Sequence, residues 1–88
     1  MTPEHDSQAR RFTLATTPIS VLDYELSGGR VVFTHTGVPD AFQGQGLAAR
    51  LVEAGLAWAR DQGLKVVPAC SYVHLYIQRH PEWQNLVA

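Results

Sequence analysis

The sequence has little sulfur, no excess of charge and no long apolar run. Cys70 is the single cysteine, so the chain cannot form an internal disulfide. The absence of disulfides is usual in a reducing compartment. The 7 Lys and Arg residues against 8 Asp and Glu residues give a formal net charge of −1, which leaves no basic footprint for nucleic acid. No apolar run approaches the roughly 18 residues that span a bilayer. We therefore expect no nucleic-acid and no membrane partner.

The first residues, MTPEHDSQARR, lack the apolar core of a secretory signal peptide, so we expect a cytoplasmic protein. Residues 1–8 are polar, and we expect them to be a flexible N-terminus ahead of a single domain over residues 9–88. The 45% content of hydrophobic residues is typical of a globular domain. A chain of this size buries only about 60–65% of its unfolded surface, so its core has little redundancy.

Period-two alternation predicts strands in the first half of the chain. The segment 10–17 (RRFTLATT) is a candidate first strand. Apolar and polar residues alternate over 21–26 and again over 31–36. Gly28 and Gly29 lie between these runs and supply the positive φ angles of a tight turn. The two runs therefore predict a β-hairpin.

The second half of the chain alternates between helix and strand patterns. Apolar residues recur at helical spacing over 47–59, the run 64–69 (LKVVPA) predicts a buried strand, and 71–80 predicts a helix that Pro81 ends. We expect the tail PEWQNLVA to pack back as a turn or short helix. The order β-β-β-α-β-α predicts an α/β (α+β) fold with a mainly antiparallel sheet of about four strands and two main helices.

The glycine-rich hexapeptide 43–48 (QGQGLA) opens the first predicted helix. A helix N-terminus offers free N–H groups and a partial positive charge, so this loop is suited to a phosphate group. No Gly-Lys-Ser/Thr follows, which excludes a P-loop. Residues 44–49 superficially match a dinucleotide-binding fingerprint. The chain, however, has no second βαβ unit and no acidic residue placed to bind the ribose, which argues against a dinucleotide. A tight strand–helix connection without a ligand is the structural alternative.

The hexapeptide matches the (Gln/Arg)-x-x-Gly-x-(Gly/Ala) pyrophosphate loop of the GNAT N-acetyltransferase superfamily. Together with FTHT.VP, VVP.C and YI.RHPE, the stretch from about Leu22 to Val87 resembles the minimal single-domain members of that superfamily. The resemblance implies a truncated GNAT-like fold and transfer of acetyl from acetyl-coenzyme A (acetyl-CoA) to a primary amine, in a small molecule or a protein. We expect a monomer without a metal. The rival function is a non-catalytic acyl-CoA-binding or interaction module.

The resemblance also implies roles for individual residues. The backbone at Val38 would contact the pantetheine arm of the cofactor, and Tyr76 would protonate the leaving thiolate or simply pack. Backbone N–H groups of the loop would hold the pyrophosphate. The expected cofactor-binding residues are Val38, Gln43, Gly44, Gln45, Gly46, Leu47 and Ala48.

Cys70 and His35 are the remaining catalytic candidates. Cys70 lies between a strand and a helix N-terminus, where a thiolate is favoured, so it is either a nucleophile that forms an acyl-cysteine or a small buried residue. His35 is expected on the same face as Val31 and Phe33, as a core histidine or a base for direct transfer. A metal site on Cys70 and His74 is a remote alternative. The short segment 17–36 has no room for further helices, so we expect an open acceptor side.

Overall fold

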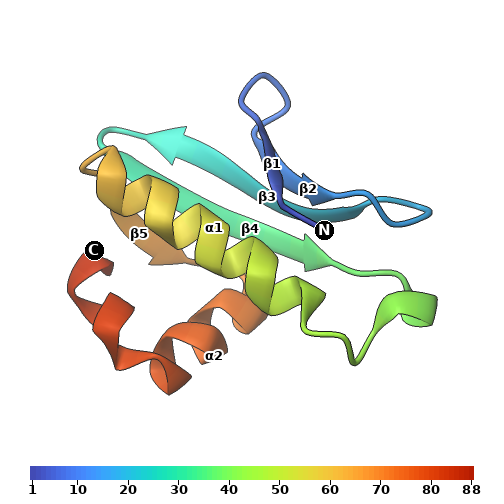
Figure 1. Ribbon diagram of the computed structural model, residues 1–88. Helices are drawn as coiled ribbons and strands as arrows, with labels where there is room; N and C mark the ends of the chain where they lie inside the picture. The colour runs from blue at the N-terminus through green and yellow to red at the C-terminus, as the bar shows by residue number, and fades with distance from the viewer.

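A five-stranded sheet in the order β1-β2-β3-β4-β5, with α1 lying across one of its faces, organises the chain (Figure 1). The computed structural model describes residues 1–88. The strands are β1 (Glu4–Asp6), β2 (Arg11–Leu14), β3 (Ser20–Ser27), β4 (Arg30–Gly37) and β5 (Lys65–Pro68). The helices are α1 (Leu47–Asp61) and α2 (Ser71–Arg79), with short 3-10 helices η1 (Asp40–Phe42) and η2 (Pro81–Leu86).

Strand pairing follows from the lengths of the connections. β1 to β4 pair antiparallel through short turns, whereas β4 and β5 pair parallel and are joined by the crossover helix α1. Gly28 and Gly29, with φ angles of 52° and 79°, form the predicted β3–β4 turn. The prediction of an α/β protein with a mainly antiparallel sheet is therefore confirmed.

Helix α1 packs closely on the sheet at Gly55. A Cβ at this position would lie 2.9 Å from Leu22 Cδ2 and 3.0 Å from Phe33 Cε1, so only glycine permits this approach. The buried face of the helix consists of Leu47, Leu51, Val52, Gly55, Leu56 and Ala59. Burial of these apolar side chains against β2 to β5 is the main stabilising term that the helix contributes.

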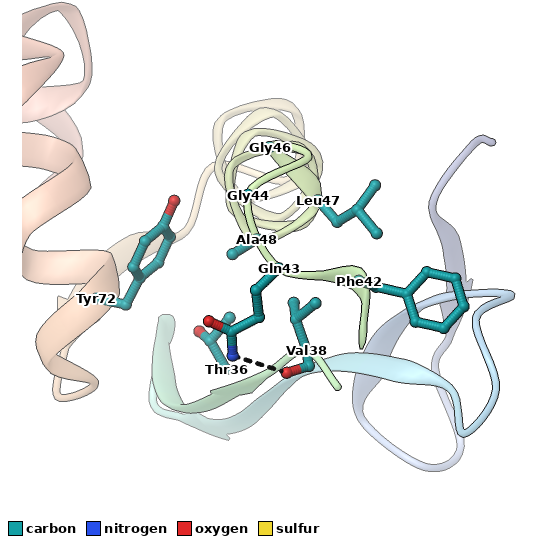
Figure 2. A pocket seen from close by; sticks show the side chains of 9 residues that line it. All are labelled: Thr36, Val38, Phe42, Gln43, Gly44, Gly46, Leu47, Ala48 and Tyr72. Carbon is teal, nitrogen blue, oxygen red and sulfur yellow. Dashed lines mark hydrogen bonds between the residues drawn. The ribbon is translucent and has the colours of Figure 1, made fainter. Parts of the chain in front are cut away.

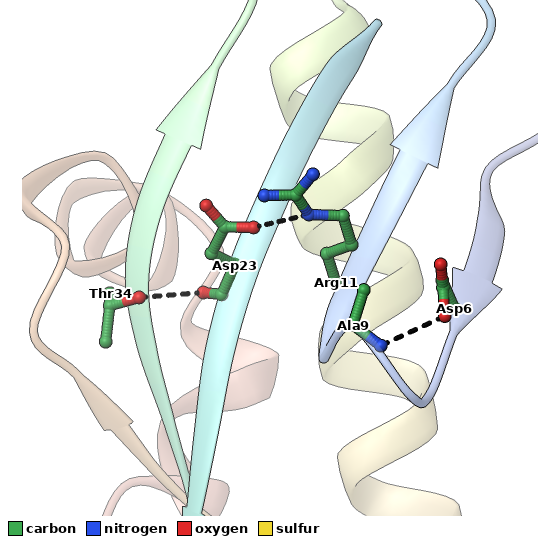
Figure 3. Close-up of polar contacts among 5 residues, drawn as sticks. All are labelled: Asp6, Ala9, Arg11, Asp23 and Thr34. Atoms are coloured by element: carbon green, nitrogen blue, oxygen red, sulfur yellow. Dashed lines mark hydrogen bonds and ion pairs between the residues drawn. The ribbon is translucent and has the colours of Figure 1, made fainter.

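Helix α2 and η2 lie beside α1 and leave the other face of the sheet uncovered. The guanidinium of Arg60 on α1 lies 5.4 Å from the centre of the Trp83 ring on η2. The tail packs back as predicted, with Leu86 buried and the Ala88 N–H donating to the Val66 carbonyl at 2.9 Å. Seen from the uncovered face, Arg11 Nε donates to Asp23 Oδ1 at 2.9 Å, and the helices lie behind the strands (Figure 3). No helix is long and apolar enough to cross a bilayer.

A β-bulge interrupts the pairing of β3 with β4. Asp23 lies opposite His35, but the next residue, Tyr24, lies opposite Phe33, so Thr34 has no partner on β3. The Thr34 hydroxyl instead donates to the Asp23 carbonyl at 3.3 Å (Figure 3). One extra residue in β4 exchanges the two faces of the strand beyond this point.

The bulge overturns the expected orientation of His35. In a regular strand His35 would share a face with Phe33, but it lies opposite Asp23 and is exposed on the uncovered face. Thr36 lies opposite the fully buried Leu22 and therefore turns toward the helices. The prediction that His35 is on the same face as Val31 and Phe33 is wrong, because alternation along the chain does not reveal an inserted residue.

The sheet has five strands rather than about four, because the segment expected to be a frayed N-terminus contains β1. His5 stacks on Phe12 with ring centroids 4.2 Å apart and meets Trp58 of α1 edge-on at 4.8 Å. Its Nε2 lies 2.6 Å from the Tyr24 hydroxyl oxygen. These contacts attach the polar strand β1 to the aromatic edge of the core. The strand predicted over 10–17 is present as β2, but it is shorter than predicted and covers only Arg11–Leu14.

We predict that His5 makes the protein less stable in mild acid. Partial desolvation of the imidazole ring against Phe12 and Trp58 lowers the pKa of His5 from 6.5, and the nearby charge of Asp6 only partly opposes this. The unfolded chain therefore takes up a proton first, so the free energy of unfolding should fall as the pH drops through 6.5. His5→Phe keeps an aromatic ring but has no titrating group at this position, so its free energy of unfolding should fall less over the same pH range. Urea unfolding of both proteins at about pH 7.5 and about pH 5.5 measures the difference. Equal losses would contradict the prediction.

Candidate functional site

The candidate site lies where the parallel strands β4 and β5 separate. Their pairing ends at Phe33 and Pro68, after which β4 continues to Gly37 while the other chain segment turns into α2. The Cys70 N–H donates to the Phe33 carbonyl at 2.8 Å and fixes this branching point. An opening therefore forms beyond the carboxyl ends of parallel strands, a common position for ligands in α/β proteins.

A pocket of about 330 Å³ occupies this opening (Figure 2). Its walls come from the end of β4, the loop before α1, the first turn of α1 and the first turn of α2. Of the predicted cofactor-binding residues, Gln45 is exposed outside the lining and the others are brought together in it. The lining consists of Thr36, Val38, Phe42, Gln43, Gly44, Gly46, Leu47, Ala48 and Tyr72.

The first turn of α1 presents unpaired N–H groups at the pocket. The helix has no side-chain cap and no acidic residue in its first turn, and its first backbone bond runs from the Arg50 N–H to the Gly46 carbonyl at 3.2 Å. The N–H groups of Leu47, Ala48 and Ala49 consequently have no partner within the helix. This end of the helix carries a partial positive charge that favours an anion.

The loop glycines leave room for such a ligand. Gly44 and Gly46 have φ angles of 82° and 74°, a left-handed conformation that side chains rarely adopt. A Cβ at either position would meet no protein atom within 4 Å, so the space before the backbone is open. Gln43 Nε2 donates to the Val38 carbonyl at 3.1 Å and ties the loop to the end of β4 (Figure 2). The residues present therefore fit a phosphate-containing ligand such as CoA.

Cys70 is the N-cap residue of α2 and adjoins the pocket through Thr36, although it is not itself part of the lining. Its half-buried Sγ is 3.4 Å from Thr36 Oγ1. Burial by itself would raise the pKa of Cys70, but the hydrogen bond with the Thr36 hydroxyl and the N–H groups of Val73, Tyr72 and Thr36 outweigh burial and lower it. The arrangement favours a thiolate beside the pocket.

Tyr76 lies outside the pocket. It is 7% exposed and stacks on His80 with ring centroids 4.1 Å apart. Burial and the charges of Glu53 and Glu82 raise the pKa of its hydroxyl. The structure thus gives Tyr76 a packing position, and Tyr72, one helical turn earlier, lies in the pocket instead.

Sequence reasoning missed Tyr72, Thr36 and Phe42 as pocket residues. The position of Tyr72 in the first turn of the helix after Cys70 was a usable signal, because that turn adjoins the thiol. Thr36 had no such signal, since only the bulge turns it inward. The remaining candidate histidines do not meet: His35 is on the uncovered face, and His74 is exposed on α2. The structure contains no cluster of three or more His, Cys, Asp or Glu residues that could hold a metal ion.

Comparisons with known proteins agree with this geometry. A family model described as GCN5-related N-acetyl-transferase matches residues 11–86. Protein NATD1 of Gallus gallus is 38% identical, over 94% of this chain and 79% of that protein. Protein NATD1 of Homo sapiens is also 38% identical, over 94% of this chain and 77% of that protein.

A GCN5-like protein from Staphylococcus aureus, solved in solution by NMR, has the same fold. The TM-score is 0.79 at 21% sequence identity, over 98% of this chain and 86% of that one. The family model covers most of the chain. The chain belongs to the GCN5-related N-acetyltransferase family.

Proposed function

We propose that this protein is an acetyl-CoA-dependent N-acyltransferase that acetylates a primary amine through acetyl-Cys70. One observation carries the proposal: a single pocket joins a loop suited to phosphate with Thr36, whose hydroxyl contacts the Cys70 thiol. Phosphate binding and a reactive thiol are the two properties that acyl transfer from a CoA thioester through an acyl-cysteine requires. A small pocket without a second helical layer over the sheet suits an acceptor that approaches from an exposed surface.

In this proposal the loop N–H groups of residues 44–48 hold the pyrophosphate, and the backbone at Val38 meets the pantetheine arm. Gln43 would then release the Val38 carbonyl that it now occupies. Phe42 and Tyr72 supply apolar surface on opposite sides of the same pocket. The substrate supplies an activated acetyl group as a thioester.

The chemistry divides into two balanced steps. The Cys70 thiolate attacks the thioester carbonyl carbon, a bond from Sγ to carbon forms, and the bond to the CoA sulfur breaks. The departing thiolate takes the Tyr72 hydroxyl proton, which solvent replaces. The neutral amine then attacks acetyl-Cys70, the amide bond forms, the amine proton passes to water and the Cys70 thiolate is restored. Burial raises the pKa of Tyr72, although the charge of Arg79 opposes this, so the hydroxyl is protonated at neutral pH.

A valine at Gly46 tests the role of the loop in binding phosphate. Gly46→Val should weaken acetyl-CoA binding at least about tenfold, because a branched side chain would fill the space before the backbone. Gly63→Val is the matched control, since Gly63 has a similar φ of 69°, equal open space and a place outside the pocket. Both variants carry similar backbone strain, so only the affinity for acetyl-CoA, measured by titration calorimetry, should separate them. Equal affinity of the two variants would rule out the loop as the phosphate site.

Mass spectrometry tests Cys70 as the residue that carries the acetyl group. Acetyl-CoA without an acceptor should add one acetyl group to Cys70, detected by mass spectrometry, and Cys70→Ala should abolish both the adduct and amine acetylation. Binding of acetyl-CoA should persist in Cys70→Ala, because the loop is intact.

Two results would contradict acetyl-Cys70 as an intermediate. Normal turnover by Cys70→Ala would indicate direct transfer. Binding without turnover or adduct in the unsubstituted protein would indicate an acyl-CoA-binding module rather than an enzyme.

Phenylalanine substitutions distinguish the roles of Tyr72 and Tyr76. Tyr72→Phe should lower kcat on the order of 10- to 100-fold with little change in CoA affinity, because it removes the proton donor but keeps the ring. Tyr76→Phe should leave kcat nearly unchanged, since Tyr76 lies outside the pocket. Steady-state kinetics of both variants provide the measurement. A large kcat loss in Tyr76→Phe alone would return the donor role to Tyr76.

A further inference from the structure

The bulge at Thr34 determines which β4 side chain faces the thiol. Without the extra residue, the inward position two residues after Phe33 would be His35. With it, His35 joins Asp23 on the uncovered face and Thr36 joins Leu22 on the helix face. The thiol therefore meets a hydroxyl rather than an imidazole.

We propose that Thr36 is the positioning residue of Cys70: its hydroxyl holds Sγ at the pocket and donates a hydrogen bond to the thiolate. The importance of this contact for catalysis rests on the function proposed above, whereas the contact itself does not. Thr36 Oγ1 lies 3.4 Å from Sγ, and the structure gives that hydroxyl no other hydrogen-bond partner. Donation to an ionised acceptor is stronger than a neutral hydrogen bond.

Several features make Thr36 suited to this role. A β-branched side chain on a strand has restricted χ1, so the hydroxyl is held in place with little loss of rotamer freedom. Thr36 is half-buried and lines the pocket, which limits competition from water. The backbone bond from Cys70 to Phe33 fixes the cysteine from the same strand, so both ends of the contact are anchored to β4.

No charged side chain supplies an alternative partner for the sulfur, but backbone N–H groups do. The N–H groups of Tyr72 and Val73 at the start of α2, together with the N–H of Thr36, also favour the thiolate. His35 lies on the opposite face of the strand, and His74 is exposed on α2. Loss of the Thr36 hydroxyl should consequently weaken, without abolishing, the preference for thiolate.

The test is the pH dependence of Cys70 alkylation by iodoacetamide in the absence of acetyl-CoA, followed by mass spectrometry. Cys70 is the single cysteine, so the reading is unambiguous. Thr36→Val removes the hydroxyl at nearly constant shape. It should move the profile to higher pH and slow alkylation at pH 7 by roughly 3- to 10-fold, with little change in the limiting rate at high pH. Thr36→Ser keeps a hydroxyl and should give a pH profile between those of the unsubstituted protein and Thr36→Val.

Thr13→Val is the matched control, because Thr13 is also half-buried on a strand but forms no side-chain hydrogen bond and faces away from the pocket. Its profile should equal that of the unsubstituted protein. Circular dichroism and thermal unfolding verify that each variant is folded, and Thr36→Ser supplies the comparison if Thr36→Val is not. An unchanged profile in a folded Thr36→Val, or a shift in Thr13→Val of equal size, would overturn the proposal.

Amine acetylation separates this proposal from the function on which its catalytic meaning rests. If acetyl-Cys70 is the intermediate, the pH profile of kcat/KM should shift in Thr36→Val in parallel with alkylation. A shifted alkylation profile with unshifted turnover would uphold Thr36 as the group that positions the thiol and reject the covalent mechanism.

Discussion

The parallel pairing of β4 with β5, and the point at which it stops, is the constraint on which the rest of the structure depends. Parallel neighbours require a crossover, which α1 provides, and the crossover places its glycine-rich entry beyond the carboxyl end of β4. Pairing ends at Phe33 and Pro68, so Cys70 begins α2 beside the same end. The glycine-rich loop, which is suited to an anion, and the Cys70 thiol at the start of α2 therefore lie at the same end of the sheet. No long insertion is needed to bring them together.

The bulge in β4 gives the two faces of the sheet different chemistry. Up to Phe33, the inward side chains are apolar and fill the core beneath α1. Beyond Thr34, the inward position is a threonine that contacts the thiol, and the outward position is a histidine opposite the Asp23–Arg11 ion pair. That ion pair is only partly buried and contributes little stability by itself. Its effect is to keep the uncovered face polar.

The N-terminal strand β1 attaches to the aromatic edge of the core, although its three residues are exposed. The sequence EHD has no apolar alternation, so nothing local indicates a strand at β1. His5 nevertheless finds two aromatic rings and a tyrosine hydroxyl, contributed by β2, β3 and α1. A single amphipathic ring can attach a polar segment when its partners come from distant positions, and no pattern within the segment reveals them.

The sequence by itself determined the β3–β4 hairpin, α1 with its glycine loop, and the place of Cys70 at the start of α2. These features depend on local conformational preferences: glycine at positive φ, apolar spacing along a helix, and the strand-to-helix junction. Only the tertiary structure showed that Thr36, and not His35, faces the thiol, and that Tyr72, and not Tyr76, lines the pocket. Those choices depend on strand register and on the packing of α2 beside α1, which involve residues far apart in the chain. The inserted residue Thr34 moves each later side chain of β4 to the other face of the sheet, but it leaves the apolar and polar alternation of the sequence unaltered.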